Sequence, residues 1–218
     1  KPQPQGGQSN SQSQNTWTTS ATGYSFFEAN RNLVKTVGRK PFYPHTEIII
    51  IGENLARKGI KPYIDFFNRD PEIRRRAYIV VAKNKKAEKI FQTSHDIEPI
   101  SAIALKEIID GQSVIGTIFA NDLREFTISL LSDTTAAVTS PVELKKVNTD
   151  KNSKDLLLVN GAAVFKNDQL VGWLTRKETR GLNWVLRPGE VVGGVLIKVP
   201  DENSKITITA KKYNNNSA

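Results

Sequence analysis

The sequence predicts a mixed α/β fold, on the border of the α+β class, in which a mixed sheet flanked by helices is followed by a smaller β-rich domain. Two short aliphatic runs, IIII at 48–51 and YIVVA at 78–82, are typical of strands buried on both faces. Segments with apolar residues at helical spacing alternate with these runs, which favours a sheet with some parallel strands. After residue 133, strand-like segments separated by turn residues predominate, which predicts the β-rich part.

The N-terminal region predicts a polar segment, a strand and a helix, in that order. Residues 1–15 are Gln, Ser, Gly and Pro with almost nothing apolar, so we expect a flexible polar segment there. The Thr-rich stretch 17–21 favours a strand. Ser25 and Glu28 have capping-box spacing, and Gly38 follows a run of apolar residues at helical spacing. These signals predict a helix that begins after Ser25 and ends at Gly38.

The middle of the chain predicts two buried strands, at 46–51 and 78–82, with two short helices between them. The first helix ends at Gly59, and Pro62 begins the second, because proline is favoured in the first turn of a helix.

Three more helices are predicted before residue 133. Asn84 has the residue type and position to cap a helix at 85–91, and a longer helix ends at Gly111. Asn121 is the predicted cap of the third, whose apolar side chains recur at helical spacing.

The second half of the chain predicts a strand at 134–147 and then a polar hairpin loop or linker at 146–155. Strands at 156–166 and 169–174 follow, joined by Asn167 and Asp168, a pair suited to a tight primed turn.

The C-terminal region predicts one more helix and two more strands. Thr175 and Glu178 repeat the capping-box spacing ahead of the helix, and strands are expected at 191–199 and 205–212. We place a domain boundary near residue 155. The predicted units are a flexible segment at 1–15, an N-terminal α/β domain at 16–155 and a smaller β-rich domain at 156–218.

The amino-acid composition excludes some kinds of functional site but does not identify the function. The chain has no Cys, which excludes disulfides, thiolate metal sites and thiol nucleophiles. Its net charge of +9 is compatible with nucleic acid or an anionic membrane as a partner. The basic residues are spread along the chain and interleaved with acidic ones, however, which favours a solvated basic surface over a nucleic-acid face. We therefore expect no nucleic acid among the partners.

Catalytic and metal-binding patterns are scarce. The two histidines, His45 and His95, are far apart, and His95 with Asp96 and Glu98 is better explained as the polar start of a helix than as a metal cluster. No nucleophile elbow, phosphate-binding loop or dinucleotide fingerprint is present. The sequence does not exclude a catalytic pair of carboxylates on facing elements, such as a glycosidase uses. We expect no enzyme activity, no cofactor and no metal.

Two kinds of residue stand out for a structural or an interaction role. Arg74, Arg75 and Arg76 form the most compact basic run, and we expect them to pair with nearby acids at the entrance to a strand. Trp173 and Trp184 lie where a hairpin and a helix should pack together, so core packing is favoured over an exposed aromatic belt.

Three of these segments resemble the Ger(x)C family of spore germination proteins. RDPEIRRRAYIVVA at 69–82 is similar to a family motif in which an Arg-Asp-x-Glu-x-Arg-Arg run precedes an apolar strand. GAAVFKNDQLVGWLTRKETRGLNWV at 161–185 resembles the second family motif, and HTEIIIIGENLARKGI at 45–60 resembles a third region. The three motifs occur in the family's order, and the resemblance covers residues 24–199.

The resemblance implies a C subunit of a nutrient germinant receptor. Such subunits are non-catalytic lipoproteins on the outer face of the inner spore membrane, and they assemble with an integral A subunit and a transporter-like B subunit. The implied fold is mixed α/β with three domains. The family's lipid-bearing N-terminal Cys does not occur here, and the resemblance extends to only part of the C-terminal region. We therefore expect a piece of a longer protein.

The leading hypothesis is a scaffold that couples its conformation to the A and B subunits. The alternatives are a module that binds the small nutrient itself and a basic nucleic-acid-binding domain. The candidate assembly or motif residues form two groups. The charged group is Arg69, Asp70, Glu72, Arg74 and Arg75. The hairpin–helix group is Gly161, Gly172, Trp173, Glu178 and Gly181.

Overall fold

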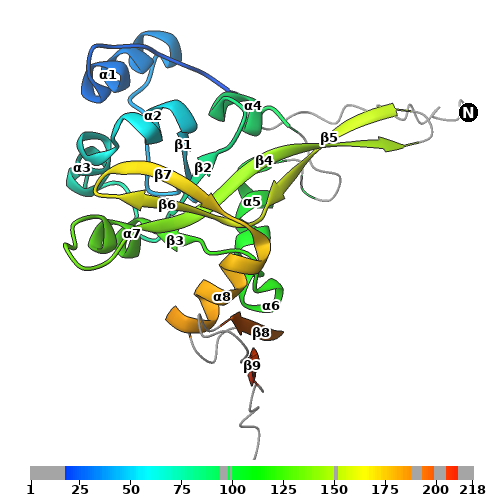
Figure 1. Cartoon of the computed structure of the whole chain (residues 1–218). Helices are drawn as coiled ribbons and strands as arrows, with labels where there is room; N and C mark the ends of the chain where they lie inside the picture. The colour runs from blue at the N-terminus through cyan, green and yellow to red at the C-terminus, as the bar shows by residue number, and fades with distance from the viewer. Residues whose placement is uncertain are drawn as a thin grey trace, which may run out of the picture.

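The centre of the protein is a mixed β-sheet with helices packed on it (Figure 1). The computed structural model describes residues 18–93, 98, 100–149, 152–187, 193–198 and 205–210. Within these residues the main sheet has seven strands in the order β1-β2-β4-β6-β7, with β3 beside β2 and β5 beside β4. The strands are β1 (Ile48–Gly52), β2 (Tyr78–Ala82), β3 (Asn121–Asp122), β4 (Val138–Thr149), β5 (Asn152–Val159), β6 (Ala162–Lys166) and β7 (Gln169–Leu174). The predicted mixed α/β fold is confirmed.

Helices connect the parallel strands and cover both faces of the sheet. β1 pairs in parallel with β2, and β2 pairs in parallel with β4, whereas β5, β6 and β7 are antiparallel to their neighbours. Parallel pairing requires crossover connections, and the chain supplies helices for them. The helices are α1 (Phe26–Val37), α2 (Glu53–Lys58), α3 (Lys61–Arg69), α4 (Ala87–Phe91), α5 (Ser101–Asp110), α6 (Gln112–Ile115), α7 (Leu123–Leu130) and α8 (Arg176–Leu186).

The core is divided by the sheet into two apolar clusters. Successive side chains of a strand point to opposite faces, so neighbouring residues of β1 and β2 belong to different clusters. Ile49 and Val81 join the cluster covered by α2, α3 and α7, whereas Ile48 and Val80 join the cluster covered by α4 and α5. This arrangement explains why both strands are apolar at every position.

Several predicted helix ends are confirmed. The Ser25 side chain accepts a hydrogen bond from the backbone N–H of Glu28 at 3.2 Å, and Gly38 ends α1 in the left-handed region with φ of 68°. Thr175 and Glu178 form a complete capping box at the start of α8. Asn167 has φ of 57° in the two-residue turn between β6 and β7, as a primed turn requires at its first central position.

Two predicted caps are wrong. Asn84 does not cap a helix; it has φ of 60° in a turn, its backbone N–H donates to Glu53 Oε2, and α4 begins only at Ala87. α7 is capped by Asp122 and not by Asn121, because the Asp122 side chain accepts from the N–H of Glu125. The Asn121 side chain is instead buried and donates to the backbone carbonyl of Val138.

Three predicted strand boundaries are also wrong. The described residues of the stretch 17–21, which are 18–21, form no strand. Residues 146–149 and 152–155, predicted as part of a loop, are strand, since β4 and β5 stay paired as far as Thr149 and Asn152. The single strand predicted at 156–166 is divided into β5 and β6 by a bend at Gly161, whose φ is 87°.

The remaining expectations concern the C-terminal strands and the division into domains. The strands predicted at 191–199 and 205–212 are present as β8 (Gly193–Lys198) and β9 (Lys205–Ala210), and these two strands form a separate antiparallel pair. The boundary predicted near residue 155 falls within β5, and the sheet continues across it through β6 and β7. The division into domains stays a prediction. The segment 1–15, Trp17, His95 and Asp96 lie outside the described residues.

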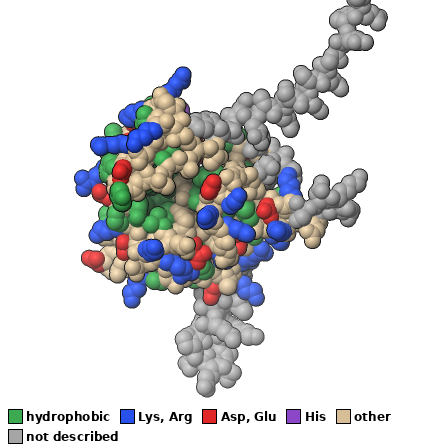
Figure 2. Space-filling view, turned by 90° about the horizontal axis from the view of Figure 1, so that it is seen from above, with side chains coloured by type: hydrophobic (Ala, Val, Ile, Leu, Met, Phe, Trp, Pro, Cys, Tyr) green, Lys and Arg blue, Asp and Glu red, His purple; other side chains and the backbone are tan. Residues whose placement is uncertain are grey.

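On the face of the molecule that Figure 2 shows, the basic residues are distributed as the sequence predicts for a solvated surface. Figure 2 views the molecule from above and shows Lys and Arg side chains spread over this face with Asp and Glu among them. No described helix combines the length and the apolar character that crossing a membrane requires.

Replacing Gly161 with alanine should destabilise the fold. A Cβ at Gly161 would lie 2.5 Å from the carbonyl oxygen of Leu174, and the positive φ disfavours any side chain. We expect Gly161→Ala to lower the free energy of unfolding by about 2–3 kcal/mol in a denaturant titration. Gly172→Ala is the control, because no atom lies within 4 Å of its Cβ position. Equal losses in the two variants would contradict this explanation.

Candidate functional site

The first candidate region is an arginine turn, defined as residues 74–76, which precedes β2. Backbone hydrogen bonds hold this turn, since Ala77 N donates to Arg74 O and Arg124 N donates to Arg75 O, both at 3.1 Å. The second bond places the start of α7 beside the turn. Arg74, Arg75, Arg76 and Arg124 are all exposed.

The expected pairing of the arginine turn with nearby acids is wrong. Glu72 Oε1 accepts a hydrogen bond from Lys40 Nζ at 2.7 Å, and this hydrogen bond raises the pKa of Lys40. Asp70 Oδ1 accepts from the backbone N–H of Glu72 at 2.9 Å, and Arg69 pairs with Asp65 at 2.8 Å. Within the described part of the chain, the three guanidinium groups of the turn form no ion pair. They therefore present positive charge to solvent.

The second candidate region is the β6–β7 hairpin with α8. Trp173 of β7 is half-buried against the cluster beneath α2 and α3, and Lys83 Nζ lies 5.4 Å from the centre of its ring. Lys83 also pairs with Glu143 of β4 at 3.7 Å. Glu178 caps α8, and Gly181 lies within that helix. The hairpin–helix residues therefore support packing.

A contact that the sequence analysis missed joins α8 to the segment between α6 and α7. Asn183 is buried, and its Nδ2 donates to the carbonyl oxygens of Gly116 at 3.1 Å and Ile118 at 2.8 Å. An asparagine within an amphipathic helix was the only signal in the sequence, and it does not identify the partner.

Arg187 extends the same contact past the end of α8. Its guanidinium lies 4.4 Å from the centre of the Phe119 ring, a cation–π geometry. Nη1 donates to Gln112 Oε1 at 3.1 Å, and Nη2 donates to Asn121 Oδ1 at 2.5 Å. Glu125 lies 3.7 Å from Nη2. One side chain thus links α8 with α6, β3 and α7.

Arg187 is one of the residues that line a polar hollow of about 530 Å³. Tyr78 lines it and donates its hydroxyl to Asp110 Oδ1 at 2.9 Å. Burial, together with this hydrogen bond and the negative charge of Asp110, raises the pKa of Tyr78 to about 12.

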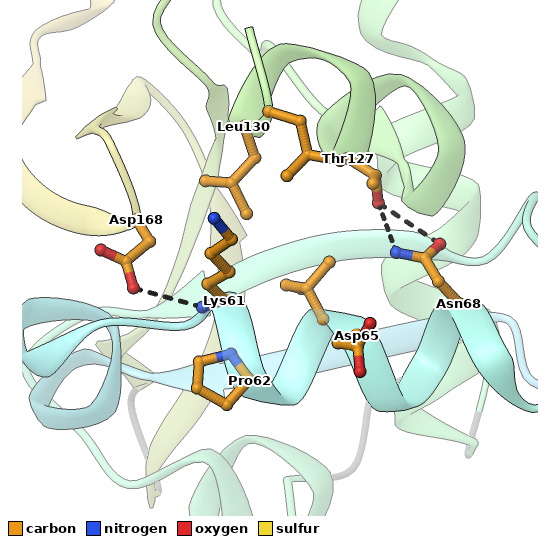
Figure 3. A pocket seen from close by; sticks show the side chains of 9 residues that line it. Lys61, Pro62, Asp65, Asn68, Thr127, Leu130 and Asp168 are labelled. Carbon is orange, nitrogen blue, oxygen red and sulfur yellow. Dashed lines mark hydrogen bonds between the residues drawn. The ribbon is translucent and has the colours of Figure 1, made fainter.

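A second hollow, of about 400 Å³, lies between α3 and α7 beside the β6–β7 turn (Figure 3). Asn68 of α3 and Thr127 of α7 are hydrogen-bonded at 3.1 Å on one side. On the other side, the backbone N–H of Lys61 donates to Asp168 Oδ2 at 3.4 Å. Pro62, Ile64, Leu130 and Leu131 supply apolar walls. A small molecule with an apolar body and polar ends would match this lining.

The described residues contain no cluster of three His, Asp or Glu side chains that could hold a metal ion. His45 is exposed, and its ring lies 6.3 Å from the ring of Phe42.

Comparison with known proteins assigns the chain to a family. Residues 1–143 match the family described as "Spore germination protein N-terminal domain", and residues 160–217 match the family described as "Spore germination B3/ GerAC like, C-terminal". The chain therefore belongs to the spore germination proteins of the GerAC type, and the resemblance to the Ger(x)C family is confirmed.

Three relatives come from Bacillus subtilis (strain 168). "Putative spore germination protein YfkR" is 31% identical over 72% of this chain and 40% of its own length. "Spore germination protein KC" is 28% identical over 77% of this chain and 44% of its own length, and "Spore germination protein B3" is 27% identical over 77% and 43%. The chain thus spans less than half the length of these relatives. A crystal structure of the GerBC protein aligns with 77% of this chain and 45% of that chain, with 20% identity and a TM-score of 0.40.

The docking of α8 should depend on Asn183. Asn183→Ala leaves two buried carbonyl oxygens without their donor, so we expect a loss of about 2–3 kcal/mol in the free energy of unfolding. Arg180→Ala on the exposed side of the same helix is the control, with an expected change within about 0.5 kcal/mol. A loss at Asn183 no larger than at Arg180 would show that the helix is held by other contacts.

The raised pKa of Tyr78 predicts a pH dependence of stability. The folded protein holds the phenol proton more tightly than the unfolded chain does, so this contribution is complete below about pH 10. It is lost as the pH rises through about 12, the pKa of folded Tyr78. Phenolate absorbance should show a late component that Tyr78→Phe removes and that Asp110→Asn moves to lower pH. An unchanged titration curve in both variants would contradict the assignment.

Proposed function

We propose that this chain is the extracytoplasmic part of a C subunit of a nutrient germinant receptor, and that it acts without catalysis. The observation that carries the proposal is the match of both family segments, in order, over residues 1–143 and 160–217. In this role the protein couples its conformation to that of an integral A subunit and a transporter-like B subunit. A lipid on an N-terminal Cys holds the full-length protein at the outer face of the inner spore membrane.

The arginine turn supports an assembly role. Its side chains are exposed and form no ion pair within the described residues, while its backbone is fixed by bonds to Arg74 O and Arg75 O. A rigid backbone that presents unpaired guanidinium groups suits recognition of carboxylates on a partner, because the guanidinium fork binds them with two parallel hydrogen bonds. Charge on such a surface contributes to specificity and to the rate of association.

The contacts of α8 support a coupling role. Asn183 and Arg187 belong to the segment that matches the C-terminal family, and they bind Gly116, Ile118 and Gln112 in the segment that matches the N-terminal family. A displacement on one side of this contact would therefore move groups on the other. Hydrogen-bond networks and packed side chains between rigid elements are the contacts that carry such coupling.

The hollow between α3 and α7 favours a second function, binding of the nutrient itself. It offers both charge signs and apolar walls in about 400 Å³, a volume suited to a small metabolite. In this alternative the chain senses the nutrient directly, and the arginine turn serves signalling and not assembly.

Charge reversal in the arginine turn separates the two functions. We expect Arg74→Glu with Arg75→Glu, in the full-length lipidated protein, to reduce co-purification with the A and B subunits by about tenfold or more. Lys177→Glu with Arg180→Glu on exposed α8 is the control with the same change in charge. Circular dichroism and a thermal melt establish that both variants fold.

The outcomes distinguish the proposals. Loss of the complex in the arginine-turn variant alone supports assembly through this surface. An intact complex that no longer responds to nutrients supports nutrient binding or signalling. An intact complex with a normal response removes the arginine turn from both functions.

A further inference from the structure

α1 is an amphipathic helix that the rest of the protein covers only in part. Figure 1 shows it at one corner of the molecule, above α2 and α3. Phe26 packs against Phe66 and Phe67, with ring centres 4.4 and 5.2 Å apart, and the Tyr43 hydroxyl donates to Asn30. None of the residues of α1 is buried, however. The helix is therefore attached along one side and open along the other.

The open side of α1 combines aromatic, aliphatic and basic side chains. Phe27, Arg31, Val34 and Lys35 follow the spacing of one helix face, and all four are exposed. Phe27 lies at the edge of this face, since its ring also packs against Phe66 with ring centres 4.8 Å apart. Tyr24 precedes them by one turn. It is fully exposed, at 105%, while Phe27 is 54% and Val34 39% exposed. We call these five residues the α1 stripe.

The charge of this region is strongly positive. Between residues 24 and 42 the acidic side chain is Glu28, and its carboxylate accepts the backbone N–H of Tyr24 at 2.7 Å. Basic side chains in the same interval are Arg31, Lys35, Arg39 and Lys40. Lys40 is paired with Glu72, and the other three form no ion pair with any residue that the structure describes. The stripe therefore lacks counter-charges of its own.

We propose that the α1 stripe docks on an anionic lipid surface. Aromatic side chains with exposed edges are favoured at the level of lipid headgroups, where an apolar ring and a polar tip are both accommodated. Arginine and lysine on the same face are attracted by anionic headgroups, and a helix of twelve residues lies in the plane of the interface. An acidic protein surface would satisfy the charges, but it gives no reason for a fully exposed Tyr24. This contact does not depend on the receptor role proposed above.

Co-sedimentation of the whole chain with vesicles tests the proposal. We expect binding to vesicles of equal parts phosphatidylglycerol and phosphatidylcholine, and little binding to phosphatidylcholine alone. Arg31→Gln with Lys35→Gln should lower the partition coefficient about 25-fold, because each charge near an anionic surface contributes about fivefold. Tyr24→Ser should lower it roughly fivefold, since it removes apolar contact and leaves the charge unchanged.

The matched control removes the same charge elsewhere. Lys177→Gln with Arg180→Gln changes the exposed side of α8, which lies at the opposite end of the molecule in Figure 1. We expect it to change binding less than about threefold, because charges beyond a Debye length from the lipid contribute little. Absence of binding to the anionic vesicles would overturn the proposal. Equal losses for the two charge pairs, or a Tyr24→Ser variant that binds as well as the wild type, would overturn it too.

Discussion

The position of β4 is the constraint on which the rest of the structure depends. Its residues 140–142 pair in parallel with β2, its start at Val138 and Thr139 pairs with β6, and the remainder pairs with β5. Through these three ladders one strand joins the parallel part of the sheet to the antiparallel part. Thr139 and Ser140 are fully buried within it, and their hydroxyls donate to the carbonyl oxygens of Ile79 and Gly161. Buried polar groups that are satisfied in this way define the register, because a shift by one residue would leave them unpaired.

The segment that matches the C-terminal family packs against the sheet around β4 through polar contacts as well as apolar ones. Gly161 permits the bend that carries the chain from β5 into β6, and the capping box at Thr175 begins α8 directly after β7. Asn183 and Arg187 then bind the segment between α6 and α7. Such a contact is specific in geometry and modest in free energy.

Local signals in the sequence predicted most of the helices and strands, and they failed where a residue had two uses. The runs at 48–51 and 78–82 and the caps at Ser25 and Thr175 depend on side chains within a few residues of one another, so spacing was sufficient. Asn121 is of a residue type that often caps helices, but in the fold its side-chain amide donates a hydrogen bond to the backbone carbonyl of Val138. The neighbouring Asp122 caps α7 instead. The arginine turn was predicted to pair with the acids beside it, yet Glu72 is reached by Lys40, which is far away in the sequence.

By itself the sequence determined the fold class, the order of most elements, the motifs of the family and the excess of positive charge, because periodicity, capping and composition are local or additive properties. Only the tertiary structure decided which arginines stay unpaired, which face of α1 stays open, and that Asn68, Thr127 and Asp168 line one hollow. Each of these depends on contacts between segments that are distant in the chain. Such contacts are selected by the packing of the whole sheet, and no short stretch of sequence contains that information.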